Sequence, residues 1–566
     1  MTQNLPPEIA TAFDAAALDW SRNGKVARLW NRDKSLWTSA TDNTAEDKWM
    51  GWLDIVAQQA AQGDRFRGIG AKVKAGGYRN VVLLGMGGSS LCPEVLSVTF
   101  GHQAGFPALH ILDSTDPAQV KAVEEMADPK DKSTLYIVSS KSGTTLEPNI
   151  FKDYFFDQSG RDGARFIAIT DPGSQMQAVA EADGFGQICY GLPSIGGRFS
   201  ALSDFGMVPG AAMGLDIPHL LARAAEMVTA CREADAANNP GVALGLSLGT
   251  LAKNGHDKVT LITSPAIYDL GAWLEQLIAE STGKLGRALI PVDREPLAAP
   301  NVYGQDRVFV YIRYAPLPDA EQDSAIAALE AAGQPVIRLT MHDKYDLGAE
   351  FFRWEVAIAV AGSVIEINPF DQPDVEASKI GTRKLTDEFN ATGKLPAETP
   401  ILEADGLKFF TDEANASQLK GASAAEILKS HLGRITAGDY FALLAYIRMT
   451  PEHEQTLSDM RLAVRDEKRV ATCLGFGPRF LHSTGQAYKG GPNSGVFLQV
   501  TCDDANDLTI PGQKFTFGIV KAAQARGDFG VLTDRKRRAL RVHLPADVDA
   551  GLAVLGKAIR TALNAF

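Results

Sequence analysis

The chain has few cysteines, and their spacing suggests neither a disulfide framework nor a metal site. Its 566 residues include five cysteines, none of them in a CxxC arrangement. We therefore interpret them as reduced thiols of a cytoplasmic protein. The nine histidines also lack the close spacing that metal ligands on one helix show, so we expect no bound metal.

Long apolar runs and an excess of positive charge are missing as well. No apolar run approaches the ~18 residues of a membrane-spanning helix, and the acidic N-terminal stretch lacks the basic start of a signal peptide. The formal net charge is −12. This argues against a nucleic-acid or membrane partner, because both need a basic face. A phosphorylated small molecule stays compatible, since a local basic pocket can form in an acidic protein.

What remains is the pattern of a large α/β protein. The composition, 45% hydrophobic and 22% charged, is that of a globular domain protein. From about Asn80, short β-branched runs alternate with helical stretches, and a second such series begins near Lys258. This alternation is typical of βαβ units, whose parallel sheets are covered by helices on both faces. We predict two such domains followed by a C-terminal α/β region.

The domain boundaries follow from changes in this pattern. Apolar residues at spacings of three and four predict helices at the N-terminus. The polar stretch Ala236–Gly245 separates the two series, and a Gly/Pro-bearing linker follows about Phe389. In the last region we expect helices at 424–432, 440–449 and 453–469 and strands at 495–501 and 539–545. The predicted parts are residues 1–75, 76–240, 241–390 and 391–566.

Two turns at predicted strand ends have the composition of phosphate-binding loops. "GMGGSS" (85–90) precedes a helix expected near Pro93, and "SSKSGTT" (139–145) precedes one expected near Glu147. Glycines let backbone N–H groups approach an anion, the helix N-terminus favours negative charge, and hydroxyls and Lys141 add donors. The alternative is a pair of ordinary βα turns with N-caps. A dinucleotide site is a weaker reading, because Ser90 replaces the third glycine of that fingerprint.

Five segments, in order, resemble the successive motifs of the glucose-6-phosphate isomerase family: "GMGGSS", "SSKSGTT", "GGRFSALS", "EQLIAESTGK" and "NPFDQPDVEASK". They span roughly Asn80 to Lys379. The resemblance implies two sugar-isomerase (SIS) domains, 76–240 and 241–390. It also implies reversible isomerisation of glucose 6-phosphate and fructose 6-phosphate through a cis-enediol, in glycolysis and gluconeogenesis, without cofactor or metal. More narrowly, the chain is similar to the isomerase half of transaldolase/glucose-6-phosphate isomerase fusions.

The resemblance also implies roles for individual residues. Glu280 would move the proton between C2 and C1, and Arg198 would face the enediolate with a charge that is always present. Lys379 would take part in ring opening. Residues implied to bind the substrate phosphate are Ser89, Ser140, Lys141, Ser142, Thr145 and Gln372. Gly88 and Gly197 would let the backbone approach the sugar.

The family's ring-opening histidine is not where its motif order would put it. Between Glu280 and Lys379 the only histidine is His342, whose context does not resemble the motif. The later segment "RFLHSTGQAYKGG" (479–491) does resemble the LHSxGQ segment of bacterial isomerases. Our hypothesis is that His482 folds over the pocket, from its own chain or from a partner subunit. An ordinary loop histidine is the alternative.

Other functions stay open at this point. Ser142 and Gly143 depart from the Thr and the bulky residue usual in the family, so another hexose or amino-sugar phosphate is a possible substrate. A non-catalytic SIS-domain sensor would keep the segment 139–145, here called the hydroxyl loop, but it would not need Glu280, Arg198 and Lys379 together. The expected partner is a sugar phosphate. A homodimer is possible, because the family is commonly dimeric.

Overall fold

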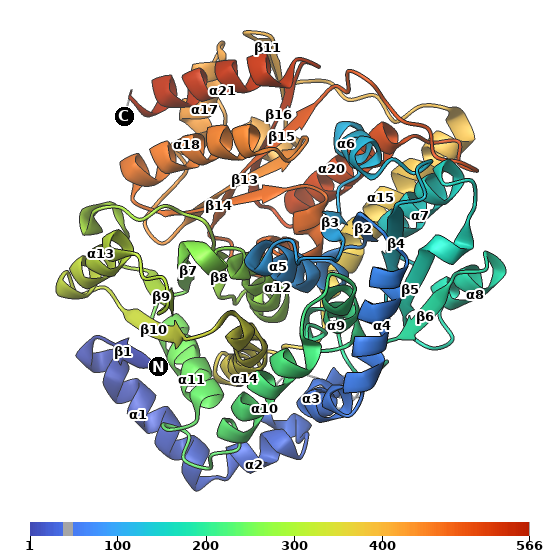
Figure 1. Cartoon of the computed structure of the whole chain (residues 1–566). Helices are drawn as coiled ribbons and strands as arrows, with labels where there is room; N and C mark the ends of the chain where they lie inside the picture. The colour runs from blue at the N-terminus through green and yellow to red at the C-terminus, as the bar shows by residue number, and fades with distance from the viewer. Residues whose placement is uncertain (38–48, 565–566) are drawn as a thin grey trace.

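The computed structural model describes residues 1–37 and 49–564, and these residues form three mainly parallel β-sheets with helices between and around them (Figure 1). The first sheet has the order β3-β2-β4-β5-β6 and is parallel throughout. Its strands are β2 (Asn80–Leu84), β3 (Ala108–Leu112), β4 (Thr134–Ser139), β5 (Phe166–Thr170) and β6 (Gln187–Tyr190). The helices between them are α5 (Leu91–Phe100), α6 (Pro117–Ala127), α7 (Leu146–Gln158) and α8 (Gln175–Ala182).

Both faces of this sheet are buried, which explains why its strands are continuously apolar. In β2, Val81 and Leu83 belong to one apolar cluster, whereas Val82 and Leu84 belong to another on the opposite face. Side chains alternate between the faces of a strand, so burial on both sides requires apolar residues at every position. The expected parallel sheet covered on both faces is thus confirmed here.

The strand order creates a crevice, and the two turns with the composition of phosphate-binding loops lie at it. β2 is flanked by β3 and by β4, so the chain changes direction between β2 and β4. In open parallel sheets, ligands bind beyond the carboxyl ends of the strands at such a switch point. Residues 85–90 follow β2 and residues 140–145 follow β4, so both turns border this crevice. The helices after them begin at Leu91 and Leu146, slightly earlier than the sequence suggested.

The second sheet has the order β1-β10-β9-β7-β8, with β1 antiparallel to the rest. Its strands are β1 (Thr2–Asn4), β7 (Lys258–Thr263), β8 (Ile290–Val292), β9 (Arg307–Tyr314) and β10 (Val336–Met341). α12 (Leu270–Thr282), α13 (Ala320–Ala331) and α14 (Leu347–Val364) accompany them. The strand β1 was not predicted, and it attaches the start of the chain to this sheet.

The remaining α-helices that the structure describes in the first 392 residues lie outside these two groups. The N-terminal ones are α1 (Pro7–Arg22), α2 (Lys25–Trp30), α3 (Trp52–Ala60) and α4 (Gly63–Ala75). They agree with the helical pattern expected there, although Asp47 and Lys48 of that pattern lie outside the described residues. The others are α9 (Asp204–Ala212), α10 (Ile217–Ala230), α11 (Pro240–Lys253) and α15 (Pro373–Thr392). The stretch Ala236–Gly245 contains the start of α11, and the domain boundaries stay predictions.

The third sheet has the order β11-β12-β16-β15-β13-β14. Its strands are β11 (Leu402–Ala404), β12 (Leu407–Phe410), β13 (Tyr440–Tyr446), β14 (Ala471–Phe476), β15 (Gly495–Cys502) and β16 (Arg538–Leu544). Its helices are α16 (Glu413–Ala416), α17 (Ala424–Leu432), α18 (Pro451–Lys468), α19 (Gly485–Gly490), α20 (Phe517–Asp534) and α21 (Val548–Leu563).

The helix expected at 440–449 is wrong, because most of this segment is β13, an interior strand between β15 and β14. Phe441, Leu443 and Ala445 face one apolar cluster, and Tyr440 and Leu444 face another. A strand buried on both faces is apolar at every position, and its sequence cannot be told from a short buried helix by periodicity.

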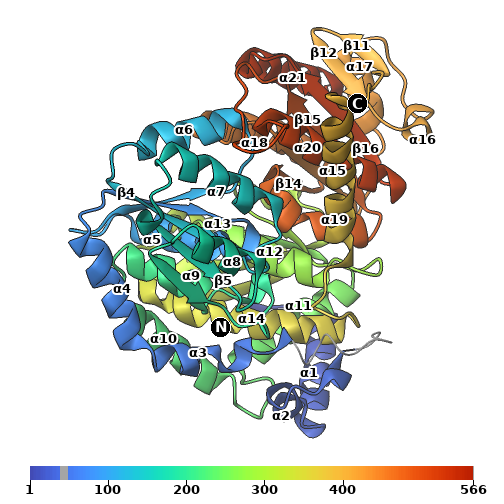
Figure 2. The same ribbon diagram turned by 90° about the vertical axis from the view of Figure 1, so that its right-hand side faces the viewer.

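The C-terminal region packs against both of the other sheet regions. Phe515 and Phe517 share an apolar cluster with Phe151 of α7, and Ala279 of α12 and Ile290 of β8 share one with Tyr440. The helix α15 lies alongside α20 (Figure 2). This packing brings the 479–491 segment to the crevice of the first sheet.

Within residues 1–37 and 49–564, none of the helices combines the length and apolar character needed to cross a bilayer.

Candidate active site

The predicted acid and the predicted guanidinium lie together in a buried position. Glu280 lies two residues before the end of α12, and Arg198 lies in the 3₁₀ turn Gly197–Phe199. The Arg198 Nη1 atom is 3.6 Å from the Glu280 Oε1 atom. Arg198 also donates from Nε to the Ser281 hydroxyl at 2.8 Å and from Nη1 to the Gln372 amide oxygen at 2.8 Å. These contacts hold the guanidinium in one orientation beside the carboxylate, with predicted residue Gln372 on its other side.

A loop before α15 is held by two buried cations, and one of them was not predicted. The Lys284 ammonium donates to the backbone carbonyls of Asn368 and Asp371, both at 2.5 Å, and to Asp371 Oδ1 at 2.7 Å. Arg198 donates to the carbonyls of Pro369 at 2.5 Å and Asp371 at 3.0 Å. Burial and the neighbouring Arg198 lower the pKa of Lys284 to about 7. Two cations therefore bind backbone carbonyls of the same loop, and both donate to the Asp371 carbonyl.

The predicted histidine also lies at the crevice, and it is paired with a carboxylate. His482 Nε2 is 3.0 Å from Glu147 Oε1, and the Gln524 amide donates to the same oxygen at 2.7 Å. Glu147 is in the first turn of α7, directly after the hydroxyl loop. Burial opposes the charged form of Glu147, but the charge and hydrogen bond of His482 bring its pKa below the ordinary value. The pair fixes the orientation of the imidazole ring.

A cavity of about 390 Å³ joins three of the predicted residues. Thr145, Lys379 and His482 line it, together with Glu147. The Lys379 side chain is 44% exposed, and its ion-pair contact, to Glu376, is long at 3.9 Å. Lys379 is thus free to turn toward a ligand in this cavity. Glu280 and Arg198 do not line the cavity.

A glutamine side chain connects the Glu280–Arg198 pair with the turn that carries His482. The Gln276 amide donates to Glu280 Oε2 at 3.1 Å and to the His482 carbonyl at 2.9 Å. The glycine turn of the first sheet lies against both groups. A Cβ atom on Gly88 would come within 2.0 Å of the Gly197 carbonyl oxygen, so only glycine at position 88 allows these two backbones to touch. Gly88 and Gly197, both predicted, are therefore in direct contact.

The hydroxyl loop shows which of its groups are free for an anion. The Ser142 and Thr144 hydroxyls bond to each other at 2.8 Å on the surface. The Ser140 hydroxyl is buried and has no hydrogen-bond partner among the described residues. Thr145 is the N-cap of α7, and its side chain makes no capping hydrogen bond. The Lys141 ammonium, by contrast, is paired with Asp171 and donates to the Leu192 carbonyl at 3.1 Å. The hydroxyls are thus better placed than Lys141 to receive a phosphate.

The remaining predicted phosphate ligand, Ser89, lies at the end of the glycine turn Gly87–Ser89.

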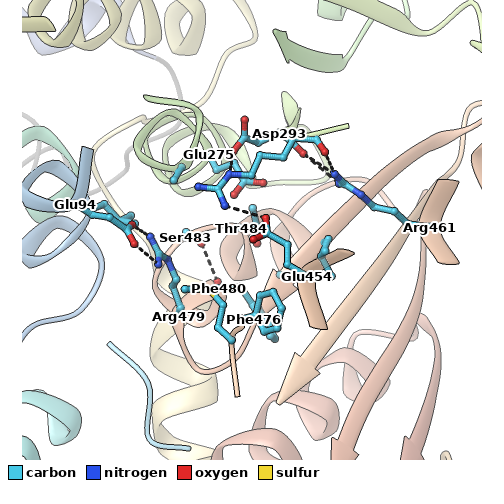
Figure 3. Close-up of a pocket in the computed structure, with 16 residues that line it drawn as sticks. Glu94, Glu275, Asp293, Glu454, Arg461, Phe476, Arg479, Phe480, Ser483 and Thr484 are labelled. Atoms are coloured by element: carbon cyan, nitrogen blue, oxygen red, sulfur yellow. Dashed lines mark hydrogen bonds and ion pairs between the residues drawn. The ribbon is translucent and has the colours of Figure 1, made fainter. Parts of the chain in front are cut away.

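The turn that carries His482 is attached to the first sheet region by an arginine. Arg479 Nη1 donates to Glu94 Oε1 of α5 at 2.9 Å (Figure 3). Arg479 Nε is also 3.5 Å from Asp113 Oδ2. Burial raises the pKa of Asp113 to about 7. Asp113, which directly follows β3, thus contacts the C-terminal region.

A second, smaller cavity lies beside this arginine and is lined by charged side chains of both signs (Figure 3). It has a volume of about 90 Å³, and its charged lining residues are Glu94, Glu275, Asp293, Glu454, Arg294, Arg461 and Arg479. Burial raises the pKa of Asp293 to about 6 and that of Glu275 well above its ordinary value. None of the residues predicted for the site lines this cavity.

One group of potential metal ligands also comes together in the described part of the chain. Asp116, Cys502 and Asp504 converge, but the Lys521 ammonium lies among them. Its Nζ atom is 2.8 Å from Asp116 Oδ2, 2.5 Å from Asp504 Oδ1 and 3.5 Å from Cys502 Sγ. A lysine charge therefore takes the position that a cation would need.

Comparison with known proteins assigns the family. A family model described as phosphoglucose isomerase matches residues 40–295. A glucose-6-phosphate isomerase of Rubrobacter xylanophilus is 31% identical over 364 residues, which cover 55% of this chain and 83% of that protein. The chain belongs to the phosphoglucose isomerase family. A glucose-6-phosphate isomerase of Prochlorococcus marinus is 27% identical over 452 residues, covering 71% of this chain and 83% of the relative. The family predicted from the five motifs is confirmed.

Solved structures share the fold. A hypothetical protein from Thermus thermophilus matches with a TM-score of 0.55 at 25% identity, over 68% of this chain and 99% of that one. A glucose-6-phosphate isomerase from Chlamydia trachomatis matches with a TM-score of 0.50 at 20% identity, over 66% of this chain and 79% of that one. The predicted α/β fold class of this phosphoglucose isomerase family member is confirmed.

Sequence reasoning missed three polar residues of the site: Glu147, Gln276 and Lys284. Glu147 looked like an acid placed to favour a helix N-terminus, which is the commonest reason for an acid there. Gln276 lies one helical turn before Glu280, on the same face, and this spacing could have identified it. Lys284 closes the "ESTGK" motif, but nothing in the sequence indicated that its ammonium is buried.

Proposed function

We propose that this chain interconverts glucose 6-phosphate and fructose 6-phosphate, a step of glycolysis and gluconeogenesis. The observation that carries the proposal is the buried contact of Glu280 with Arg198 at 3.6 Å. A carboxylate and a fixed guanidinium side by side provide both a base for a carbon acid and a charge for the resulting enediolate. Family membership supports the same reaction.

Glu280 is the proton carrier in this mechanism. It removes the proton from C2 of the open-chain aldose and returns it to C1. In the same conversion the O2 hydroxyl loses its proton and O1 gains one, so that the carbonyl group passes from C1 to C2 through the enediol. The oxygen that becomes negative in the enediolate is stabilised by Arg198. Four further hydrogen bonds hold the Arg198 guanidinium, so little reorganisation is needed as charge develops.

Ring opening falls to His482 and Lys379. The C1–O5 bond breaks as the ring oxygen gains a proton and the C1 hydroxyl loses one. With its Nε2–H donated to Glu147, His482 has Nδ1 left to take or give the proton. Lys379 lines the same cavity and supplies the second group. The phosphate lies at the hydroxyl loop and the N-terminus of α7, where unpaired N–H groups favour an anion.

Three finer assignments rest on the sequence. The likeness to the isomerase half of the transaldolase fusions is supported by the motif at 479–491, which carries His482. A homodimer rests on the resemblance to the family. A cytoplasmic location rests on the scattered cysteines. All three are proposals.

The test is turnover of fructose 6-phosphate, coupled to an NADP-dependent glucose-6-phosphate dehydrogenase without added metal. The variant Glu280→Gln should lose on the order of 10²- to 10⁴-fold in kcat, while fructose 6-phosphate still raises its melting temperature. Glu275→Gln is the matched control, because Glu275 lies on the same helix but faces the second cavity of about 90 Å³. Wild-type kcat in Glu280→Gln would contradict the assigned base.

The same assay tests His482 and the substrate. His482→Ala should slow turnover of the cyclic sugar, and unchanged turnover would remove His482 from the mechanism. Mannose 6-phosphate serves as the competing substrate, because Ser142 and Gly143 depart from the family pattern. A protein that binds fructose 6-phosphate but turns over neither sugar would be a sensor.

A further inference from the structure

Lys284 is a buried lysine whose side-chain hydrogen bonds all go to one loop. Its side chain is only 4% exposed, and its three donated hydrogen bonds reach Asn368 and Asp371. These residues precede α15 directly. An ammonium has three N–H donors, so Lys284 uses its full capacity on this loop. Such a concentration of charge-assisted bonds on one short stretch of backbone fixes the loop firmly.

The loop determines where two predicted site residues lie. Gln372 follows Asp371 and accepts a hydrogen bond from Arg198, and Lys379 lies two turns further along α15. Arg198 bonds to the same Asp371 carbonyl as Lys284 does. The orientation of the guanidinium beside Glu280 therefore depends on a loop whose other side is held by Lys284.

This arrangement is costly for stability, which points to a use in positioning. Lys284 and Arg198 are both buried cations close together, and this proximity disfavours the charged form of each. Charged groups that face Lys284 are Arg198, Glu280 and Asp371, and Asp374, Lys489, Arg535 and Arg537 line a cavity of about 580 Å³ that also reaches it. An apolar side chain would fill the space at lower electrostatic cost, but it would leave the loop carbonyls without donors.

We propose that Lys284 is a positioning residue of the isomerase, which holds the 368–371 loop so that Gln372 and Arg198 meet the substrate beside Glu280. The inference rests on the proposed function. Lys284 does not itself contact the substrate in this proposal. It acts by fixing the positions of Arg198 and Gln372.

The experiment compares Lys284→Met and Lys284→Arg with Lys258→Met in the coupled assay and in thermal melting. Lys258 is a matched control, since its side chain is 3% exposed and its ammonium bonds to Asp257 Oδ1 at 2.7 Å and the Gly438 carbonyl at 2.6 Å, away from the site. Lys284→Met should lower kcat on the order of tenfold to a hundredfold with a smaller rise in KM, because small misplacements of catalytic groups have effects of this size. Lys258→Met should lower the melting temperature but leave kcat unchanged.

Rescue by arginine separates positioning from general stability. Lys284→Arg keeps the charge and several donors, and the adjoining cavity offers room for the larger group. It should restore kcat to within a few-fold of wild type. If Lys284→Met does not fold, Lys284→Gln takes its place with the same readouts. Wild-type kcat and KM in the neutral variant would overturn the inference, as would a kcat loss that Lys258→Met shares. A wild-type protein without turnover would instead overturn the proposed function, and this inference with it.

Discussion

The ion pair of Arg307 with Glu295 allows a quantitative prediction about how the C-terminal region is attached. Both side chains are 0% exposed, and Arg307 Nη2 is 2.8 Å from Glu295 Oε2. Glu295 Oε1 also accepts hydrogen bonds from the Thr472 N–H at 3.1 Å and hydroxyl at 2.7 Å. Thr472 is on β14 of the third sheet, whereas Arg307 is on β9 of the second. One carboxylate thus links two sheets.

Replacing Glu295 with leucine should be strongly destabilising. Removing one partner of a buried pair leaves an uncompensated charge and costs about 3–5 kcal/mol. The two Thr472 donors also lose their acceptor, at a cost of about 1 kcal/mol or more. We expect a loss of about 4–6 kcal/mol in the free energy of unfolding. The double variant Glu295→Leu/Arg307→Met removes both charges, so it should recover most of the loss.

Urea unfolding followed by far-ultraviolet circular dichroism measures these changes from the midpoint and slope. The control is the surface pair of Arg338 with Glu330, in which each side chain is 27% exposed and the contact is also short, at 2.7 Å. Glu330→Leu should cost about 0–1 kcal/mol, because water and salt reach and screen this partly exposed pair. The reasoning is refuted if Glu295→Leu costs no more than Glu330→Leu, or if the double variant is no more stable than the single one.

Two further predictions concern the backbone contact at the site and a buried acid. Gly88→Ala should abolish most turnover, because the new Cβ would force the turns at Gly88 and Gly197 apart. Gly68→Ala is the control: a Cβ there meets nothing within 4 Å, so turnover should be unchanged. Equal activity of the two variants would contradict the contact. Glu355 is 0% exposed, neither carboxylate oxygen has a partner among the described residues, and burial raises its pKa well above the ordinary value. The contribution of such an acid to stability is fully present below its pKa in the unfolded chain and is lost as the pH rises above that value. The free energy of unfolding of Glu355→Gln relative to wild type should therefore increase by up to about 1.4 kcal/mol per pH unit above about pH 5. Urea midpoints that shift with pH equally in both proteins would contradict this prediction.

The sequence alone identified the features that depend on local pattern. Strands such as β2 and β4 are short apolar runs bounded by glycine and hydroxyl residues, and their alternation with helices specifies a parallel sheet without knowledge of distant contacts. The motifs around Ser89, Arg198 and Glu280 were recognisable for the same reason, since each is a contiguous stretch. The error at 440–449 has the opposite origin: β13 is apolar on both faces only because two separate layers cover it.

Tertiary structure alone decided which distant residues share the site. His482 is 335 positions from Glu147 in the chain, yet the two are in hydrogen-bond contact, and the motif could suggest the histidine but not its partner. The burial of Lys284 depends on a loop more than 80 residues further along, so its role follows from packing. Local sequence determines the backbone periodicity and turn chemistry of each element, because these depend on neighbouring residues. The pairing and desolvation of charges depend on which surfaces meet, and only the folded chain brings those surfaces together.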